Sequence, residues 1–251
     1  MIFLENFSSV CPFSRSLAMK IISLSVLAIF LFTANTFAST TDQQNLLRKA
    51  SMVLEEIKNA PDEEIPTELI ARAKAIIIFP TMIKGGFMVG ARYGKGVASV
   101  RSSKTGQWGS PAFLYTAGGS FGFQIGVEAV DLVLLVMSQR GIEGLIKDQF
   151  TLGADAAISA GPVGRHAEAA ADILMQGEIY SYSRSKGIFA GVSLKGTVIT
   201  ADTDANWDYY SRPLSPQDIL IYGKVQRNPE SATRFKRYLN RLAPTRRPNK
   251  G

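Results

Sequence analysis

The stretch that decides the fold is AKAIIIFPTMIKGGFMVGARYGKGVASVR, residues 73–101. Its first part, AIIIFP at 75–80, is a β-branched run closed by a proline, which is typical of a buried strand. From residue 87 to residue 93 apolar side chains alternate with glycine, methionine and arginine, and residues 97–101 predict the next strand. This alternation predicts half-buried antiparallel strands with glycine-rich connections.

The strand pattern extends beyond this stretch and is interrupted once. Residues 113–116, 121–128 and 132–137 predict three more strands, and residues 178–184 and 187–200 predict two further ones. Between them, residues 141–150 and 154–176 are rich in alanine and predict helices. A polar segment at 201–208, ADTDANWD, predicts a hairpin tip.

Helices are predicted at both ends of this β-rich region. Residues 42–59 place apolar side chains at helical spacing on one face, which predicts an amphipathic helix. Asn228 as N-cap and Pro229 in the first turn predict a second helix that ends before Pro244. Its apolar stripe comprises Ala232, Phe235, Leu239 and Leu242. The chain is therefore predicted to be α+β, with a glycine-rich antiparallel sheet, sandwich- or barrel-like, flanked by helices.

The first 38 residues predict a secretory signal peptide. Met19 and Lys20 precede the short apolar run IISLSVLAIFLF, and small residues follow at Thr36 and Ala38. We expect translation to start at Met19 and cleavage to follow Ala38. The single cysteine, Cys11, precedes the apolar run, so it cannot be a lipoprotein anchor. The sequence thus predicts an exported, periplasmic or envelope-associated protein without disulfides or cysteine metal sites.

Charge divides the remaining chain into a domain at 39–222 and a basic C-terminal segment at 223–251, made of a helix and a disordered tail. The whole sequence carries a net charge of +7, and the C-terminal segment holds nine Lys or Arg against one Glu. Such a segment favours contact with an anionic surface such as phospholipid. A solvated tail that keeps the protein soluble is the alternative. Nucleic acid is not expected, because no aromatic and basic strand signature accompanies the charge.

Ser120 lies in GGSFG, residues 118–122, which fits the nucleophile pattern G-x-S-x-G of serine hydrolases. That nucleophile needs a strand before it and a helix after it, whereas the residues after Ser120 alternate as in a strand. The one histidine, His166, would have to complete the triad. We therefore predict a structural role for Ser120 and keep the hydrolase as the less favoured hypothesis.

No cofactor or metal site is predicted. The aspartates of 201–208 alternate as at the start of a calcium loop, but Trp207 occupies the glycine position of that loop and Pro213 its final position. The sequence contains neither a Walker A motif nor a dinucleotide-binding fingerprint.

Three blocks, taken together, resemble the SYLF domain family, also called the Ysc-type actin-binding or lipid-binding domain. They are residues 73–101, residues 116–137 (TAGGSFGFQIGVEAVDLVLLVM) and residues 187–210 (GIFAGVSLKGTVITADTDANWDYY). The resemblance covers roughly residues 42–210 and implies a non-enzymatic module that binds lipids. In eukaryotic relatives it implies phosphoinositide binding, and in some fungal members actin binding. Actin is not expected as the partner of an exported protein.

The predicted function is the binding of anionic phospholipid at a membrane surface, through the amphipathic helix and basic residues. The alternative is a structural or protein-interaction module whose partner is an envelope protein. Ordinary solvated side chains are the alternative for each proposed basic residue. These residues are Lys84, Arg92, Lys95, Lys186 and Lys195 on the sheet and Arg234, Arg237 and Arg241 on the C-terminal helix.

Overall fold

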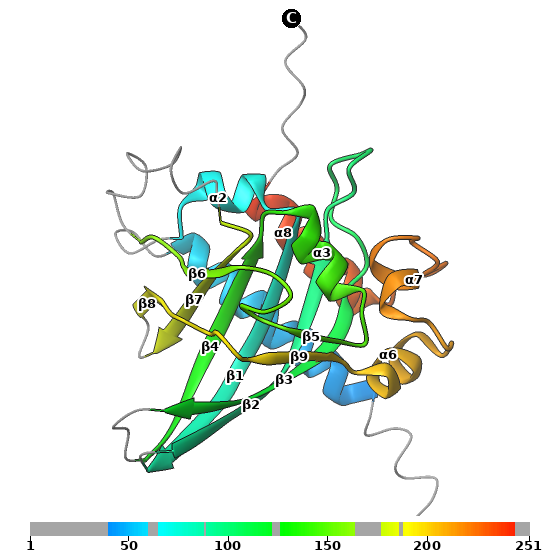
Figure 1. The fold of residues 1–251 in the computed structure, drawn as a ribbon. Helices are drawn as coiled ribbons and strands as arrows, with labels where there is room; N and C mark the ends of the chain where they lie inside the picture. Colours follow the sequence, from blue (N-terminus) through cyan, green and yellow to red (C-terminus); the bar gives the residue numbers. More distant parts are fainter. Residues whose placement is uncertain are drawn as a thin grey trace, which may run out of the picture.

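A computed structural model describes residues 40–59, 65–87, 89–121, 126–163, 177–185 and 188–243. They form one curled, nine-stranded sheet flanked by helices (Figure 1). The strands are β1 (Ala75–Phe87), β2 (Val89–Val100), β3 (Ala112–Phe121), β4 (Gly126–Val136), β5 (Gln149–Thr151), β6 (Ile158–Ala160), β7 (Ile179–Ser185), β8 (Ile188–Gly191) and β9 (Val198–Ala201). The helices are the N-terminal helix (40–59), α2 (Thr67–Arg72), α3 (Gln139–Leu145), α6 (Thr203–Tyr210), α7 (Pro216–Leu220) and α8 (Glu230–Leu242).

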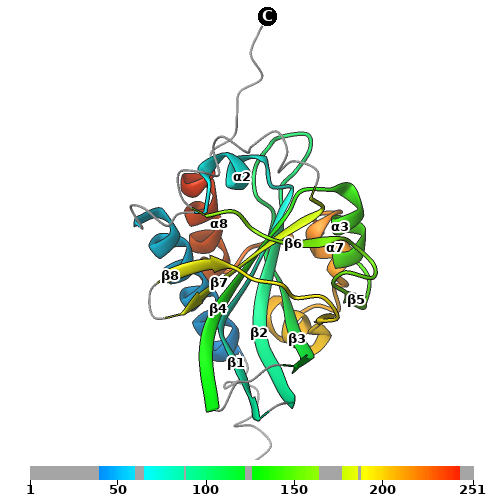
Figure 2. The same cartoon turned by 60° about the vertical axis from the view of Figure 1, so that its left-hand side comes forward.

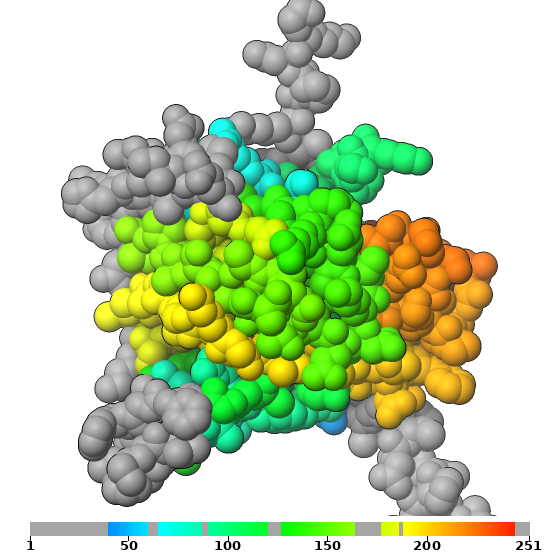
Figure 3. All heavy atoms as spheres, viewed as in Figure 1, coloured from blue at the N-terminus to red at the C-terminus, as the bar shows by residue number. Residues whose placement is uncertain are grey.

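The predicted α+β class is confirmed. The strand order is β5-β9-β3-β2-β1-β4-β7-β6, with β8 paired to β7. All the pairings between these strands are antiparallel except that between β6 and β7. The sheet curls into a half-barrel, so that β5 to β9 and α3 cover one face of the long strands (Figure 3).

The long central strands bury side chains on both faces at one end. Ile76 and Ile78 of β1 belong to a core cluster with the N-terminal helix, α2 and α8. Ile77 and Phe79 alternate with them and join a second cluster with α3, α7 and β5. Figure 2 shows the N-terminal helix, α2 and α8 on one side of the sheet, with α3 and α7 on the other. A strand buried on both faces must be apolar throughout, which explains the run AIIIF.

Strand β1 does not end at Pro80, as the sequence led us to expect, but continues to Phe87. The register of β1 against β4 shifts between Phe79 and Met82, because a proline has no N–H to give to the ladder. Thr81 takes a left-handed backbone conformation with φ of 60°. Its N–H donates to Asp131 Oδ1 of β4 at 2.9 Å, so the bulge leaves this donor satisfied.

The carboxylate of Asp131 also forms an ion pair. Arg184 of β7 donates from Nε to Asp131 Oδ2 at 2.9 Å, and its Nη1 pairs with Glu56 of the N-terminal helix. The side chains of Arg184 and Asp131 are mostly buried. Four elements are thereby joined at the bulge: β1, β4, β7 and the N-terminal helix.

Two glycines of β2 allow the side chains of β1 to pack over that strand. A Cβ at Gly96 would lie 2.3 Å from Phe79 Cδ1 and 2.6 Å from the Ile78 carbonyl oxygen, and a Cβ at Gly94 would lie 3.0 Å from Met82 Cβ. Gly119 of β3 shows the contrast, because no heavy atom would lie within 4 Å of its Cβ. Gly94 and Gly96 thus leave the space that Met82 and Phe79 of β1 occupy.

The predicted amphipathic helix is present as the N-terminal helix, and its apolar face packs against the sheet. Leu47, Val53, Leu54 and Ile57 lie buried against the sheet. The predicted stripe of α8 is buried beside it, with Phe235 at its centre. A membrane therefore cannot receive the apolar face of either helix in this packing, which corrects the expected mode of lipid binding.

Several predicted boundaries are wrong. The strand expected at 121–128 does not exist as one element, because β3 ends at Phe121 and β4 begins at Gly126 on the far side of the β1–β2 pair. The helix expected at 141–150 is the shorter α3, followed by β5. The helix expected at 154–176 is absent over 154–163, where β6 lies, and residues 164–176 lie outside the described part of the chain. The strand expected at 187–200 is divided into β8 and β9, and the separate strands expected at 87–93 and 97–101 are replaced by the single β2 and the end of β1.

Residues 201–208 do not form a hairpin tip: Ala201 ends β9, and α6 begins at Thr203. Asp202 caps this helix by accepting from the N–H of Ala205 at 3.2 Å. The fully buried Asn206 then exchanges two hydrogen bonds with the backbone of Phe113: its Oδ1 accepts at 2.8 Å and its Nδ2 donates at 3.0 Å. Residue types that favour a turn here cap a helix and bind it to β3.

Asn228 is also not the N-cap of α8. That helix begins at Glu230 after Pro229, and Asn228 Oδ1 instead accepts from Ser110 Oγ at 2.8 Å. The predicted signal peptide at 1–38, the tail after Ala243, His166 and Lys186 all lie outside the described residues.

We expect Gly96→Ala to lower the free energy of unfolding by about 1–3 kcal/mol, because its Cβ overlaps Phe79 and the Ile78 backbone. Urea denaturation of purified protein measures this. Gly119→Ala is the matched control and should be neutral or stabilising by up to about 1 kcal/mol. Equal effects at the two positions would contradict the packing argument.

We expect Asp131→Ala to lower the free energy of unfolding by about 2–3 kcal/mol, because Arg184 and the N–H of Thr81 lose their acceptor. The double variant Asp131→Ala/Arg184→Met should cost less than the sum of the single changes, because it does not leave a mostly buried Arg184 without Asp131, and only Glu56, whose side chain is partly exposed, loses an ion pair. Asp148→Ala removes an exposed carboxylate and is the control. Additive costs in the denaturation cycle would refute the coupling.

Candidate functional site

The strands β1 to β4 project beyond the helices at the end of the sheet that follows the Pro80 bulge (Figure 2). We call this projecting part the tip; it comprises residues 83–94 without Met88, residues 117–121 and residues 126–130. Ile83 pairs with Tyr93 and Ala129, so the three residues share one face of the tip. Because the helices stop short of it, this face meets solvent.

Large apolar side chains are exposed on that face. Val127 is 80% exposed, Ile83 52% and Tyr93 51%. The ring of Tyr93 lies 6.4 Å from that of Tyr115, measured between centroids. We call this surface the tip face and define it by Ile83, Tyr93, Tyr115, Val127 and the neighbouring Lys95. Exposed apolar groups gathered in one place, with tyrosines among them, are typical of a contact surface.

The tip face continues into a groove of about 580 Å³ beside the N-terminal helix. Ile83 and Lys95 line it from the sheet, and Arg48 and Lys49 line it from the helix. Lys95 Nζ lies 3.7 Å from Asp202 Oδ2. Three cations therefore stand next to exposed apolar groups, and the helix contributes through its polar face.

Lys84 and Arg92 lie on the opposite face of the tip, where they are register partners. Lys84 Nζ pairs with Glu128 Oε2 at 2.9 Å, and Arg92 Nη2 donates to the carbonyl oxygen of Gly119 at 3.1 Å. Burial lowers the pKa of Arg92 from its ordinary value. The two predicted residues are thus engaged within the tip itself.

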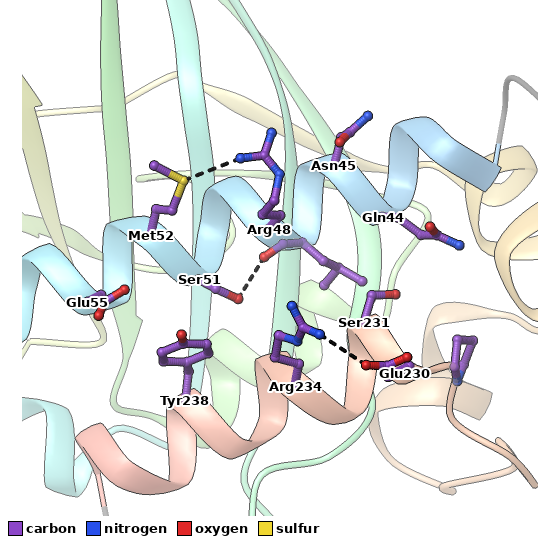
Figure 4. Close-up of a pocket in the computed structure, with 12 residues that line it drawn as sticks. Gln44, Asn45, Arg48, Ser51, Met52, Glu55, Glu230, Ser231, Arg234 and Tyr238 are labelled. Carbon is purple, nitrogen blue, oxygen red and sulfur yellow. Dashed lines mark hydrogen bonds and ion pairs between the residues drawn. The ribbon is translucent and has the colours of Figure 1, made fainter.

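A second groove, of about 400 Å³, separates the N-terminal helix from α8 (Figure 4). Arg48 Nη1 contacts the sulfur of Met52 at 3.7 Å on one wall, and Arg234 Nη2 pairs with Glu230 at 3.0 Å on the other. Tyr238 also lines this groove. Its charges are balanced, because Glu55 and Glu230 oppose the two arginines.

The predicted basic residues are not brought together into one site. Arg237 is exposed on α8, and Arg241 lies over the ring of Tyr238 at 4.5 Å. Lys195 is exposed in the turn before β9. Sequence reasoning missed Arg48 and the exposed apolar residues of the tip. The alternation of apolar residues in β1 and β2 could have indicated the apolar residues of the tip. It could not indicate that no helix covers them.

Ser120 lies in β3, where it is the register partner of Gly90. The strand expected after Ser120 is not found as one element, because β3 ends at Phe121, one residue after Ser120, and β4 begins at Gly126. The helix that should follow a nucleophile elbow is not at 121, and residues 122–125 lie outside the described part. Ser120 thus lies near the end of β3, and the next described element is β4, not a helix.

Among the residues that the structure describes, no helix has both the length and the hydropathy of a membrane span. Within the same residues, no three His, Cys, Asp or Glu side chains gather as metal ligands would.

Comparison with known proteins gives consistent results. The family model Ysc84, described as "Las17-binding protein actin regulator", matches residues 117–242. SH3 domain-containing YSC84-like protein 1 from Homo sapiens is 35% identical over 180 residues, 69% of this chain and 52% of the relative. The same protein from Bos taurus is 34% identical over 186 residues, 72% of this chain and 54% of the relative.

A yeast relative extends the comparison. LAS seventeen-binding protein 3 from Saccharomyces cerevisiae (strain ATCC 204508 / S288c) is 36% identical over 193 residues, 76% of this chain and 41% of the relative. The chain spans about half the length of the curated relatives it matches. The name of the yeast relative describes a binding protein, and the family description names an actin regulator. The family match covers half of the chain, and with these relatives it shows that the chain belongs to the Ysc84 family, the SYLF family that its sequence blocks resemble.

Proposed function

We propose that this protein is a non-enzymatic module that binds anionic phospholipid at a membrane surface of the cell envelope, with the tip face toward the membrane. One observation carries the proposal: Ile83, Tyr93 and Val127 are exposed together beside Lys95, Arg48 and Lys49. Apolar groups favour the boundary between head groups and acyl chains, and cations favour an anionic lipid surface. The membership in the Ysc84 family supports a binding function.

The tip face replaces the amphipathic helix as the source of apolar contact. The apolar face of the N-terminal helix is buried in the core, so its exposure would require unfolding of that core. The tip face is already exposed, and a membrane can cover it without any rearrangement. Tyrosine suits this position, because its ring is apolar and its hydroxyl remains hydrated at the interface.

We expect Tyr93→Ser/Val127→Ser to weaken binding to vesicles that contain phosphatidylserine by about tenfold or more, because two apolar side chains no longer enter the interface. Vesicle co-sedimentation measures the partition coefficient. Trp207→Ser is the control, since Trp207 is 53% exposed on α6, away from the tip. A loss that is equal for Trp207→Ser and the tip variant would refute the assignment of the tip face.

The electrostatic part has its own test. Lys95→Gln should weaken binding to anionic vesicles about fivefold, since one cation near such a surface contributes roughly 1 kcal/mol. Arg237→Gln removes the same charge from α8 and should leave binding unchanged. Raising the salt concentration should weaken binding to anionic vesicles. Equal binding to neutral and anionic vesicles, insensitive to salt, would contradict any role for charge.

Export to the envelope is part of the proposal and rests on the sequence pattern at 1–38. Intact-mass measurement of protein from its own host should give a chain that starts at Ser39. A mature chain that retains residues 19–38 would contradict export through a cleaved signal peptide.

The second candidate is a protein-interaction module. It is favoured by the groove between the N-terminal helix and α8, whose walls carry Arg48, Met52, Arg234 and Tyr238. Methionine, tyrosine and arginine are enriched at protein interfaces. The names of the family and of the yeast relative also specify a protein partner. A pull-down without lipid that recovers one stoichiometric partner, lost in Arg48→Ala/Tyr238→Ala, would favour this candidate over lipid binding.

A further inference from the structure

A pocket of about 790 Å³ lies at the end of the sheet opposite to the tip. It is enclosed by α2, the 102–110 connection, α3, α7 and α8, which Figure 1 shows together around that end. We call it the basic pocket, because every charged residue that lines it within the described chain is a cation: Arg72, Lys74, Arg101, Lys104 and Lys236. The groove in Figure 4 has equal numbers of each sign, and the groove at the tip has two aspartates.

Arg101 is held by neutral partners at this pocket. Its Nη1 donates to the carbonyl oxygen of Ala71 in α2 at 2.8 Å, and its Nη2 to that of Ala243 at the end of α8 at 2.9 Å. Its guanidinium lies 4.7 Å from the centre of the Trp108 ring. These contacts fix the position of the charge without neutralising it. Burial lowers the pKa of Arg101, so an anion nearby would offset the cost of keeping it charged.

One wall of the basic pocket is apolar. Ile219, Leu220 and Ile221 of the α7 region line it together with Val225, and Ile221 is 42% exposed. The pocket therefore combines a cationic part with an apolar part, and its volume falls within the range of small-molecule sites, about 300–1,000 Å³. Cations of one sign grouped in a cleft focus their field on its interior.

We propose that the basic pocket binds a small amphiphile that carries a phosphate group, with the phosphate among Lys74, Lys104 and Lys236 and the apolar part against α7. Phosphate oxygens accept several charge-assisted hydrogen bonds, which suits a group of lysine and arginine donors. The same chemistry is present in a lipid head group and in a soluble organic phosphate. This site does not depend on the tip face, which lies at the other end of the β1–β2 pair.

The test uses dihexanoyl phosphatidic acid, dissolved as monomers, and the full chain with Trp207→Phe, so that Trp108 is the fluorescent reporter. We expect a saturable change in the emission of Trp108, since its ring contacts Arg101, and heat release in titration calorimetry. Lys74→Gln/Lys104→Gln should weaken the binding at least tenfold. Lys58→Gln/Lys147→Gln loses the same charge from exposed lysines outside the pocket and should bind as the parent does.

Further ligands distinguish a membrane lipid from a soluble phosphate and separate the contribution of the phosphate from that of the apolar part. Dihexanoyl phosphatidylcholine, whose head group is neutral overall, should bind far more weakly, and inorganic phosphate should bind more weakly because it lacks the apolar part. Phosphatidic acid in vesicles identifies a membrane source if Lys74→Gln/Lys104→Gln reduces that binding too. Tyr93→Ser/Val127→Ser should leave the binding of the dissolved lipid unchanged, so failure at the tip and failure here are distinguishable.

Three results would overturn the proposal. The first is the absence of both an emission change and heat release with millimolar phosphatidic acid. The second is equal affinity of the parent and of Lys74→Gln/Lys104→Gln for this lipid. The third is an equal loss of affinity in that variant and in its charge-matched control. Inorganic phosphate binding as tightly as the lipid would refute the role of the apolar wall.

Discussion

A proline in the central strand is the constraint on which the structure depends. Strand β1 pairs with β2 on one side and β4 on the other, yet Pro80 cannot donate a hydrogen bond to either. The chain solves this with a bulge whose free N–H, that of Thr81, is accepted by Asp131. The same carboxylate binds Arg184, which also reaches Glu56. The position of the N-terminal helix is thus linked to the point at which the central strand changes register.

The bulge also divides the sheet into two parts with different physical roles. Before it, both faces of β1 are buried between helices and the curled part of the sheet, and the side chains are aliphatic. After it, the strands form the tip, where glycine is frequent and one face carries exposed Ile83 and Tyr93. The proposed membrane contact lies at the tip, and the basic pocket lies at the buried end. One hairpin therefore supports two separate surfaces.

Sequence reasoning succeeded where the periodic spacing of apolar residues matches the face that packs against the core. The spacing of Leu47, Leu54 and Ile57 predicted the N-terminal helix, because a helix on the surface of a core has one buried face. It failed where a polar residue serves a tertiary contact. Asparagine is common in turns, but the side-chain amide of Asn206 hydrogen-bonds to the backbone N–H and C=O of Phe113, as a neighbouring strand would. These bonds hold α6 against β3.

The candidate site was less predictable than the fold for a related reason. Basic residues in a sequence show no sign of which of them share a surface: Lys84 and Lys95 are close in sequence but lie on opposite faces of the tip. The basic pocket gathers Arg72, Lys104 and Lys236 from three separate segments, and no spacing predicts this. Exposure of the tip face likewise depends on where the covering helices stop.

The packing of α8 beside the N-terminal helix affects how the chain can assemble. Phe235 lies in the same cluster as Leu47, about 190 positions earlier, so this cluster closes only by contacts between distant parts of the chain. During synthesis, Phe235 is added about 190 residues after Leu47. Until then the apolar face of the N-terminal helix lacks part of its cover. Exposed apolar surface of this kind promotes aggregation, so we expect the nascent chain to bind holdase chaperones.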